Sequence, residues 1–258
     1  MALLELHGLT KTFGQNTAVM ALDLLVEEGR IKGLIGPNGS GKTTVFNMIS
    51  GFLTPTRGRI YFDNKDITNL PPHRTARLGL ARTFQLTALF REMTVLENVL
   101  VCCHLHTGTN LFQQFWRDRK VRRREKSLEL KALGLLEWMG LRDLAGEKAG
   151  DLPQGHAAAL GIANVLAAEP KLILLDEPVG GMNPTETADT MARIKSVRDS
   201  GVTVFLVEHD MKAVLGACDE VTCINFGNKI AEGEPRAVCS HPQVIEAYLG
   251  GEVDSCFL

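Results

Sequence analysis

The sequence has no long apolar run and no excess of charge of one sign. No window approaches the roughly 20 apolar residues that span a bilayer, and the first residues lack the basic and apolar stretches of a secretory signal. The chain carries 28 Lys and Arg against 30 Asp and Glu, a net charge of −2. Because there is no overall basic field, we expect no nucleic acid partner, and we expect any membrane association to come through a partner protein.

Cysteine is present but not in any pattern that would bind zinc. The six cysteines are scattered, without paired C-x-x-C spacing and without nearby histidines in a pattern that would suggest zinc. We therefore expect reduced thiols in the cytosol. The cysteines are Cys102, Cys103, Cys218, Cys223, Cys239 and Cys256.

The order of apolar patterns predicts one large α/β domain with a subdomain, for which 258 residues suffice. Residues 3–9 and 19–26 alternate apolar and polar, which predicts an antiparallel strand pair. "IKGLIG" then predicts a buried strand that runs through a glycine-rich turn into a helix beginning near Lys42. From about 86 to 150 the patterns are helical, with no β-rich run, as expected for a helical insertion.

After this insertion, strands and helices alternate. The strand-like runs are "KLILLDEP", "VTVFLVEHD" and "EVTCINFGNKIAEG". Helical patterns at 184–199 and 210–217 separate them. The alternation predicts a parallel sheet built from βαβ units.

The segment "GPNGSGKTT" carries the most specific chemistry in the chain. It satisfies the pattern G-x-x-x-x-G-K-[ST] between a predicted strand and a predicted helix, which disfavours a glycine turn that only packs the helix. Glycines let backbone N–H groups curl around a phosphate, and the helix adds its positive dipole end. Lys42 would supply a point charge to the β- and γ-phosphates, and Thr43 would ligate Mg²⁺. The predicted nucleotide-binding residues here are Asn38, Gly39, Ser40, Gly41, Lys42, Thr43 and Thr44.

Acidic residues and a histidine end two of the later strands. Asp176 and Glu177 follow "LILL", at the edge where loops of a parallel sheet meet their ligand. We expect Asp176 to hold Mg²⁺ through water and Glu177 to act as general base on the attacking water. A solvated loop is the alternative for such a pair. His209 ends "VFLVEH" and is a candidate to contact the γ-phosphate, although a lone His is usually structural.

The order phosphate loop, "TFQ" with Gln85, helical insertion, "LLDEP" and "VEHD" resembles the ATP-binding subunits of ABC transporters over nearly the whole chain. By motif, Phe13 in "KTFG" resembles the aromatic that stacks on adenine, with a core aromatic as the alternative. Gln85 resembles the switch residue that joins the Mg²⁺ site to the helical subdomain, which implies both a catalytic and a metal-binding role. "GGMNP", at 180–184, resembles the loop that contacts the opposite subunit.

Within the family, "FREMTVLENVLV", "GMNPTET", "EHDMK" and "EAYLG" look closest to the LivG-type subunits of branched-chain amino acid importers. The resemblance implies an α/β P-loop ABC ATPase, with a parallel-sheet core over 1–85 and 151–258 and an antiparallel β subdomain. It also implies a helical subdomain at 86–150, with a signature helix at about 152–167.

The resemblance further implies ligands and partners. The ligands are ATP and Mg²⁺, and the activity is a transport-coupled ATPase. The partners are transmembrane permease subunits and a homologous ATPase subunit, in a homodimer or a heterodimer. The expected location is the cytoplasmic face of the cell membrane, as a peripheral protein.

The signature segment departs from the family pattern. Where the family reads approximately L-S-G-G-Q, this chain has "LPQGH" at 152–156. Pro153 replaces a hydroxyl and removes a backbone N–H, and Gln154 replaces a glycine where close backbone approach is needed. Each lost hydrogen bond to phosphate costs about 1.5–3 kcal/mol. In the family this segment acts on ATP held by the partner subunit, so the sequence predicts impairment at the partner's site and an intact helix.

These departures keep rival functions open. The first rival is a nucleotide-binding regulatory or catalytically impaired ABC subunit. A soluble ABC ATPase acting on ribosomes or DNA usually carries two fused cassettes or a long coiled coil, and neither is seen. A small-molecule kinase would not explain Gln85, Glu177 and His209 together. The basic run at 117–126 predicts a solvated helix face, with proximity to the inner leaflet and then nucleic acid as the alternatives.

Overall fold

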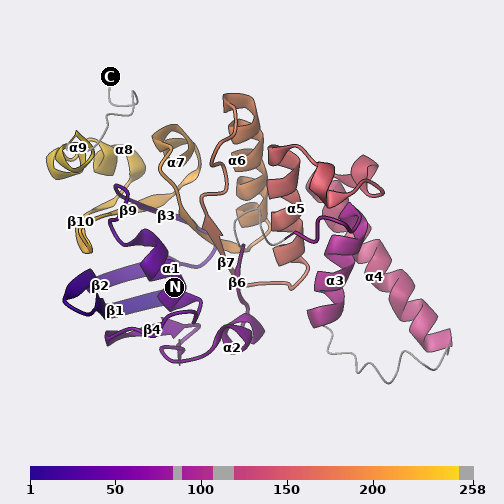
Figure 1. The fold of residues 1–258 in the computed structure, drawn as a ribbon, viewed down its shortest axis with the longest axis horizontal. Helices are drawn as coiled ribbons and strands as arrows, with labels where there is room; N and C mark the ends of the chain where they lie inside the picture. Colours follow the sequence, from indigo (N-terminus) through magenta and orange to yellow (C-terminus); the bar gives the residue numbers. More distant parts are fainter. Residues whose placement is uncertain (84–88, 107–118, 250–258) are drawn as a thin grey trace. The chain divides into compact units, whose positions relative to one another are not determined.

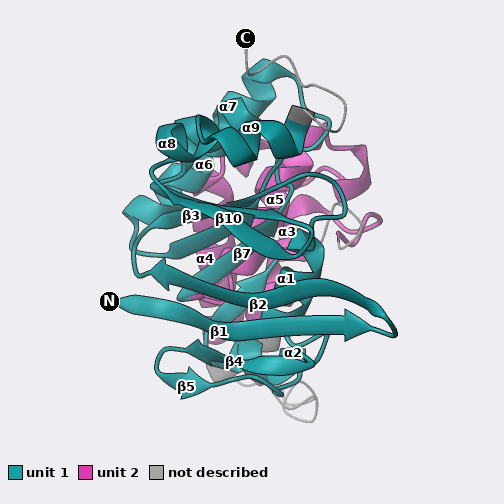
Figure 2. Ribbon diagram, turned by 90° about the vertical axis from the view of Figure 1, so that its left-hand side faces the viewer, with its two compact units in different colours: residues 1–82, 171–258 teal, residues 83–170 magenta. Residues whose placement is uncertain are grey.

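The computed structural model describes residues 1–83, 89–106 and 119–249 of the chain. The chain divides into two compact units, which Figure 2 shows in different colours. Unit 1 contains residues 1–82 and 171–258, and unit 2 contains residues 83–170. Within the described residues, no helix is both long and apolar enough to cross a bilayer.

The N-terminal part of unit 1 is a four-stranded antiparallel sheet in the order β2-β1-β4-β5. Its strands are β1 (Ala2–Phe13), β2 (Asn16–Glu27), β4 (Arg57–Phe62) and β5 (Lys65–Asp66). On β1, Leu4 and Leu6 are buried while Glu5 and His7 reach solvent, so the alternation in the sequence marks the face that enters the core. The predicted strand pair is therefore present and extends further than its pattern.

The second sheet of unit 1 has six strands in the order β10-β9-β3-β8-β7-β6. Figure 1 labels β10, β9, β3, β7 and β6 of this sheet. They are β3 (Ile31–Ile35), β6 (Leu80–Arg82), β7 (Leu172–Asp176), β8 (Thr203–Val207), β9 (Glu220–Asn225) and β10 (Asn228–Gly233). All neighbours are parallel except β9 and β10. The carboxyl ends of the parallel strands therefore meet at one edge, where the predicted motifs lie.

Helices of unit 1 pack on these sheets. They are α1 (Lys42–Ile49), α2 (Pro72–Arg77), α6 (Pro184–Asp199), α7 (Met211–Ala217), α8 (Pro235–Cys239) and α9 (Pro242–Leu249). The core combines buried side chains of α1 with those of both sheets. Its centre includes Phe46 of α1 and Phe205 of β8, whose ring centroids are 5.0 Å apart.

Unit 2 is built from helices. They are α3 (Val95–His106), α4 (Arg119–Trp138), the short 3₁₀ turns η3 (Arg142–Leu144) and η4 (Ala149–Asp151), and α5 (Gln154–Leu166). The three α-helices pack on one another. The predicted signature helix is α5, and Pro153 stands at its N-cap with φ −55°, so proline at the start is compatible with the helix.

Two features of the sheet differ from the sequence predictions. The run "EVTCINFGNKIAEG" is a hairpin of β9 and β10, with Phe226 and Gly227 in the turn. The short strand β6 was not predicted, because three residues are too few to show a period. β10 and β6 are the two edge strands of this sheet. The fold is the predicted mixed α/β architecture, with parallel and antiparallel sheets and a helical subdomain.

Candidate functional site

A glycine loop connects β3 to α1 and turns the backbone where only glycine fits. Gly36, Gly39 and Gly41 have φ values of 150°, 77° and 106°. A Cβ on Gly36 would lie 2.1 Å from the carbonyl oxygen of Ile224, and one on Gly41 would lie 2.4 Å from that of Ala18. The loop is therefore wedged between β9 and β2, and any side chain at these two glycines would displace it.

The side chain of Lys42 is hydrogen-bonded to the backbone of the loop. Its side chain is buried, and Nζ donates to the carbonyl oxygens of Gly36 (2.6 Å) and Pro37 (2.9 Å). Burial lowers the pKa of Lys42, and the nearby carboxylates of Glu177 and Asp176 act in the opposite direction. The charge that the sequence assigns to phosphate binding is thus bound to the loop and is within electrostatic reach of both acidic residues.

The remaining predicted loop residues differ in exposure. Asn38, Gly39 and Thr43 are exposed, and Thr44 is half-buried. Ser40 is buried, and among the described residues its Oγ has no hydrogen-bond partner. The solvent-facing residues of the loop and of the first turn of α1 are therefore Asn38, Gly39 and Thr43.

Asp176, at the end of β7, forms an ion pair that the sequence did not indicate. Its Oδ2 lies 2.7 Å from Nη2 of Arg82, and both side chains are only 9% exposed. Nη1 of Arg82 also donates to Oδ1 of Asn47 (2.7 Å) and to Oγ of Ser50 (3.1 Å). The guanidinium therefore links the end of β7 to one side of α1.

Glu177 follows in a left-handed conformation, with φ 48°. Its N–H donates to the carbonyl oxygen of Val207 at 3.0 Å, which ties the turn after β7 to the end of β8. Its Oε1 is 4.0 Å from Nδ1 of His209, and both side chains are part-exposed. The structure thus brings the predicted base and the predicted γ-phosphate contact together at the edge of the sheet.

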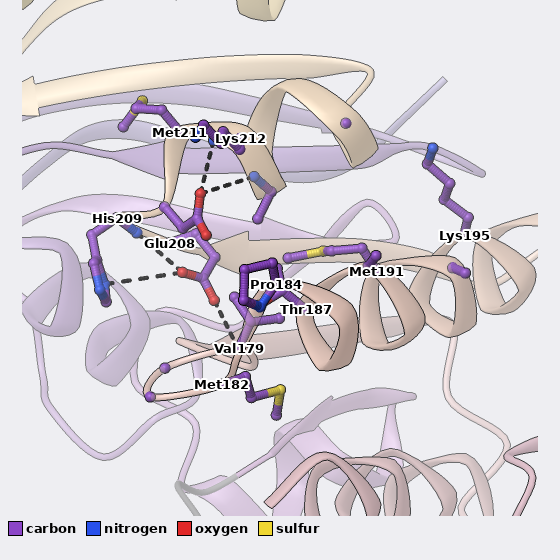
Figure 3. Close-up of a pocket in the computed structure, with 17 residues that line it drawn as sticks. Val179, Met182, Pro184, Thr187, Met191, Lys195, Glu208, His209, Met211 and Lys212 are labelled. Carbon is purple, nitrogen blue, oxygen red and sulfur yellow. Dashed lines mark hydrogen bonds and ion pairs between the residues drawn. The ribbon is translucent and has the colours of Figure 1, made fainter. Parts of the chain in front are cut away.

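Glu208 is a buried carboxylate between these groups that sequence reasoning missed. It accepts hydrogen bonds from the backbone N–H groups of Val179 (3.0 Å) and His209 (3.2 Å), as Figure 3 shows. Burial raises the pKa of Glu208, and the two N–H donors oppose that rise. Because it holds both the loop after Glu177 and the backbone of His209, it sets their spacing.

The "GGMNP" segment lies on a groove of about 690 Å³ between α6 and α7. Met182, Met191 and Met211 line it together with Glu208 and His209 (Figure 3). Asn183 caps α6 through a capping box, accepting from the N–H of Glu186 while the Glu186 side chain accepts from the N–H of Asn183. The loop predicted to face the opposite subunit is thus held in shape by its own helix.

Two further residues were predicted for this site. Phe13, at the end of β1, is 50% exposed, so it is not a core aromatic. Nζ of Lys11 lies 5.1 Å from the centroid of its ring. Gln85 lies outside the described residues.

Tyr248 of α9 also reaches the phosphate loop, although its position in the sequence gave no such signal. Burial raises the pKa of its phenol, and the nearby backbone of Gly36 acts in the opposite direction. The hydroxyl oxygen is shielded from solvent. The C-terminal helix therefore supports the first residue of the loop.

The donor set fits Mg²⁺ bound together with a nucleotide. A threonine hydroxyl and a carboxylate, Thr43 and Asp176, are oxygen ligands of the kind that Mg²⁺ uses when phosphates and waters complete its shell. The described residues contain no cluster of three or more His, Cys, Asp or Glu that would hold a metal alone. The residues therefore suit a metal that arrives with its phosphates.

A phosphate loop follows the central parallel strand β3, and acidic residues stand at the ends of β7 and β8. This arrangement places the chain among the P-loop nucleotide-binding proteins. Comparison with known proteins narrows this class. The family model described as "ABC transporter" matches residues 19–180, and the chain belongs to this family of ATPases. A second model, "Branched-chain amino acid ATP-binding cassette transporter", matches residues 228–254.

Individual relatives cover almost the whole chain. The high-affinity branched-chain amino acid transport ATP-binding protein BraF of Pseudomonas aeruginosa is 44% identical over 96% of this chain and 98% of its own length. LivG of Escherichia coli, which carries the same description, is 41% identical over 96% and 98%. Among solved structures, the ADP conformation of an ATP-binding cassette of an ABC transporter has a TM-score of 0.86 at 36% identity, covering 97% of this chain and 100% of that one. A dimeric bacterial ABC transporter cassette has a TM-score of 0.75 at 26% identity over 90% and 99%.

Proposed function

We propose that the chain is the MgATP-hydrolysing subunit of an importer for branched-chain amino acids or related small solutes. The observation that carries this proposal is similarity to branched-chain amino acid transport ATP-binding proteins over 96% of the chain. The match at 228–254, outside the general ABC model, supports the same solute class. These relatives are transport ATP-binding proteins and do not favour the regulatory, non-hydrolysing alternative.

Each site residue has a role in this proposal. The backbone of residues 38–41 and the ammonium of Lys42 bind the β- and γ-phosphates. Thr44 is a further nucleotide-binding residue. Thr43 and Asp176, with Gln85, hold Mg²⁺, which would neutralise phosphate charge when bound. Phe13 stacks on the adenine.

Glu177 and His209 carry the chemistry. The Glu177 carboxylate accepts a proton from the attacking water, and its part-exposed side chain at the sheet edge leaves room for that water. His209 contacts the γ-phosphate and reports its loss. The two side chains, 4.0 Å apart, can therefore act on the same phosphoryl group.

The assembly in this proposal is a dimer of ATPase subunits on transmembrane permease subunits, at the cytoplasmic face of the membrane. In that arrangement the phosphate loop of one subunit faces the signature segment of the other. Pro153 and Gln154 then act on the partner's nucleotide. A heterodimer with a partner that has an intact signature would keep one competent site, on this chain's own loop.

The assembly is tested by purifying the tagged chain from its own cells with membrane proteins retained. The solute is tested by measuring leucine uptake into vesicles that contain the purified complex. We expect MgATP-dependent leucine uptake that Lys42→Ala abolishes through loss of phosphate binding. Glu177→Gln should bind MgATP but not turn it over, whereas Glu28→Gln, at an exposed position of unit 1, should behave as the original chain. Uptake of a sugar instead of leucine would contradict the solute class.

A further inference from the structure

The turn between β9 and β10 carries an aromatic residue where the backbone disfavours one. Phe226 and Gly227 have φ values of 44° and 76°, the left-handed pair that two-residue hairpin turns usually fill with Asn-Gly. A side chain other than Gly, Asn or Asp costs free energy in this conformation. Phe226 is also 81% exposed, more than any other large apolar side chain of the described residues except Met1. Neither the turn nor the core accounts for an aromatic here.

This turn is fixed to the nucleotide site by its backbone. The N–H of Gly227 donates to the carbonyl oxygen of Ser40 in the phosphate loop at 3.0 Å. The carbonyl oxygen of Gly227 accepts from the N–H of Met20 on β2 at 2.9 Å. The amide of Asn228 donates to the carbonyl oxygen of Phe226 at 3.0 Å. Figure 2 shows β10 beside β2, so the exposed ring is held at the edge that the phosphate loop and β2 share.

The predicted adenine-stacking residue lies near the same end of β2. Phe13 pairs with Asn16 across the β1–β2 hairpin, and the α-carbon of Gly227 packs against the backbone of Ala18. Asn16 and Ala18 are two residues apart, which is roughly 7 Å along a strand. A flat base in van der Waals contact on both faces needs about the same separation, since each contact is about 3.5 Å. Lys11 already lies over the Phe13 ring, which leaves the ring's other face for a base.

We propose that Phe226 is the second wall of the base site, so that the purine of the bound nucleotide packs on Phe226 as well as on Phe13. This inference rests on the proposed ATP-binding function. Stacking on an exposed ring recognises any aromatic base through its face and ignores the phosphates. Phe226 therefore favours a nucleoside triphosphate over a polyphosphate without a base.

Phe226→Asn separates this role from a structural one. Asparagine tolerates the left-handed conformation better than phenylalanine, so the melting temperature should stay the same or rise. If the base packs on the ring, MgATP should bind about fivefold to a hundredfold more weakly by calorimetry. Magnesium tripolyphosphate, which has no base, should bind as it does to the original chain. Phe226→Tyr, which keeps a ring, should retain MgATP affinity.

The control is Leu25→Asn, which replaces a 48% exposed apolar side chain on β2 away from the turn and should alter the affinity for neither ligand. Equal MgATP affinity in Phe226→Asn and the original chain would overturn the proposal. An equal loss of affinity for MgATP and for magnesium tripolyphosphate would also overturn it, because such a loss indicates a distorted phosphate loop. If Phe226→Asn does not fold, Phe226→Tyr and Phe226→Ala are compared instead. An equal loss of MgATP affinity in these two variants would overturn the proposal, because only tyrosine keeps a ring. Absence of MgATP binding to the original chain would instead refute the proposed function.

Discussion

Replacement of Arg82 by methionine tests whether the buried ion pair with Asp176 holds the site together. Methionine keeps much of the side-chain length and can still pack on Phe46, whose ring centroid lies 5.7 Å from the guanidinium carbon. It removes the 2.7 Å contact to Asp176 and the hydrogen bonds to Asn47 and Ser50. The main cost is that the Asp176 carboxylate, only 9% exposed, loses its partner.

The magnitude follows from that burial. Removal of one partner of a buried pair costs about 3–5 kcal/mol, because the other charge stays buried. The ammonium of Lys42 is close enough to Asp176 to offset part of this cost, so we expect the low end, about 3 kcal/mol. With a urea slope of about 2 kcal/mol/M, the unfolding midpoint should fall by about 1.5 M.

Urea denaturation followed by circular dichroism measures this change. The Arg82→Met, Asp176→Asn double variant should lose less stability than the sum of the single variants, because it leaves no buried charge unpaired. Arg59→Met is the matched control, since Arg59 pairs with Asp66 at 67% and 38% exposure and should cost at most about 1 kcal/mol. If Arg82→Met costs no more than Arg59→Met, the pair does not organise the site.

Three further predictions concern binding and turnover. Burial lowers the pKa of Lys42 from 10.5, and a bound phosphate should raise it again, so MgATP binding at alkaline pH should take up a proton and the affinity should fall as the pH rises through the lowered pKa. Calorimetry at alkaline pH in buffers of different ionisation enthalpy would detect this proton uptake. Binding heats that are equal in all buffers would contradict it. Tyr248→Phe should weaken MgATP binding by about fivefold and cost at most about 1.5 kcal/mol of stability, because only the hydroxyl beside Gly36 is lost; unchanged affinity would assign the ring a packing role alone. Replacement of Pro153 by Ser and Gln154 by Gly should raise phosphate release by the isolated chain at saturating ATP by about tenfold or more, and equal rates would show that the signature segment is not limiting.

Local signals in the sequence predicted the centre of unit 1 well. The apolar run of β3, the glycine pattern and the helical spacing after Lys42 agree with one another, and the structure has strand, loop and helix in that order. The helix predicted at 184–199 matches α6 at both ends, because Asn183 and Pro184 mark its start through capping and a fixed φ.

Interactions between distant segments could not be read in the same way. Arg82 and Asp176 are 94 residues apart, and nothing in either local pattern indicates the pair. The β9–β10 turn was missed because Phe226-Gly227 lacks the Asn-Gly signal that marks a hairpin. Tyr248 sits in a helical pattern whose position near Gly36 depends on the packing of α9. Tertiary contacts determine these features, and local sequence propensity does not predict them.

In the proposed function, the charged residues of the site can combine a structural and a chemical role without conflict. An ammonium group has three hydrogens, and Lys42 uses two of them on the carbonyl oxygens of Gly36 and Pro37. Among the described contacts the third remains for a phosphate oxygen, so binding need not break the bonds that shape the loop. Asp176 meets Arg82 through Oδ2, which leaves Oδ1 for the water shell of Mg²⁺. A phosphate and a metal bound as proposed would therefore meet groups already held in place by the fold, which would lower the ordering cost of binding.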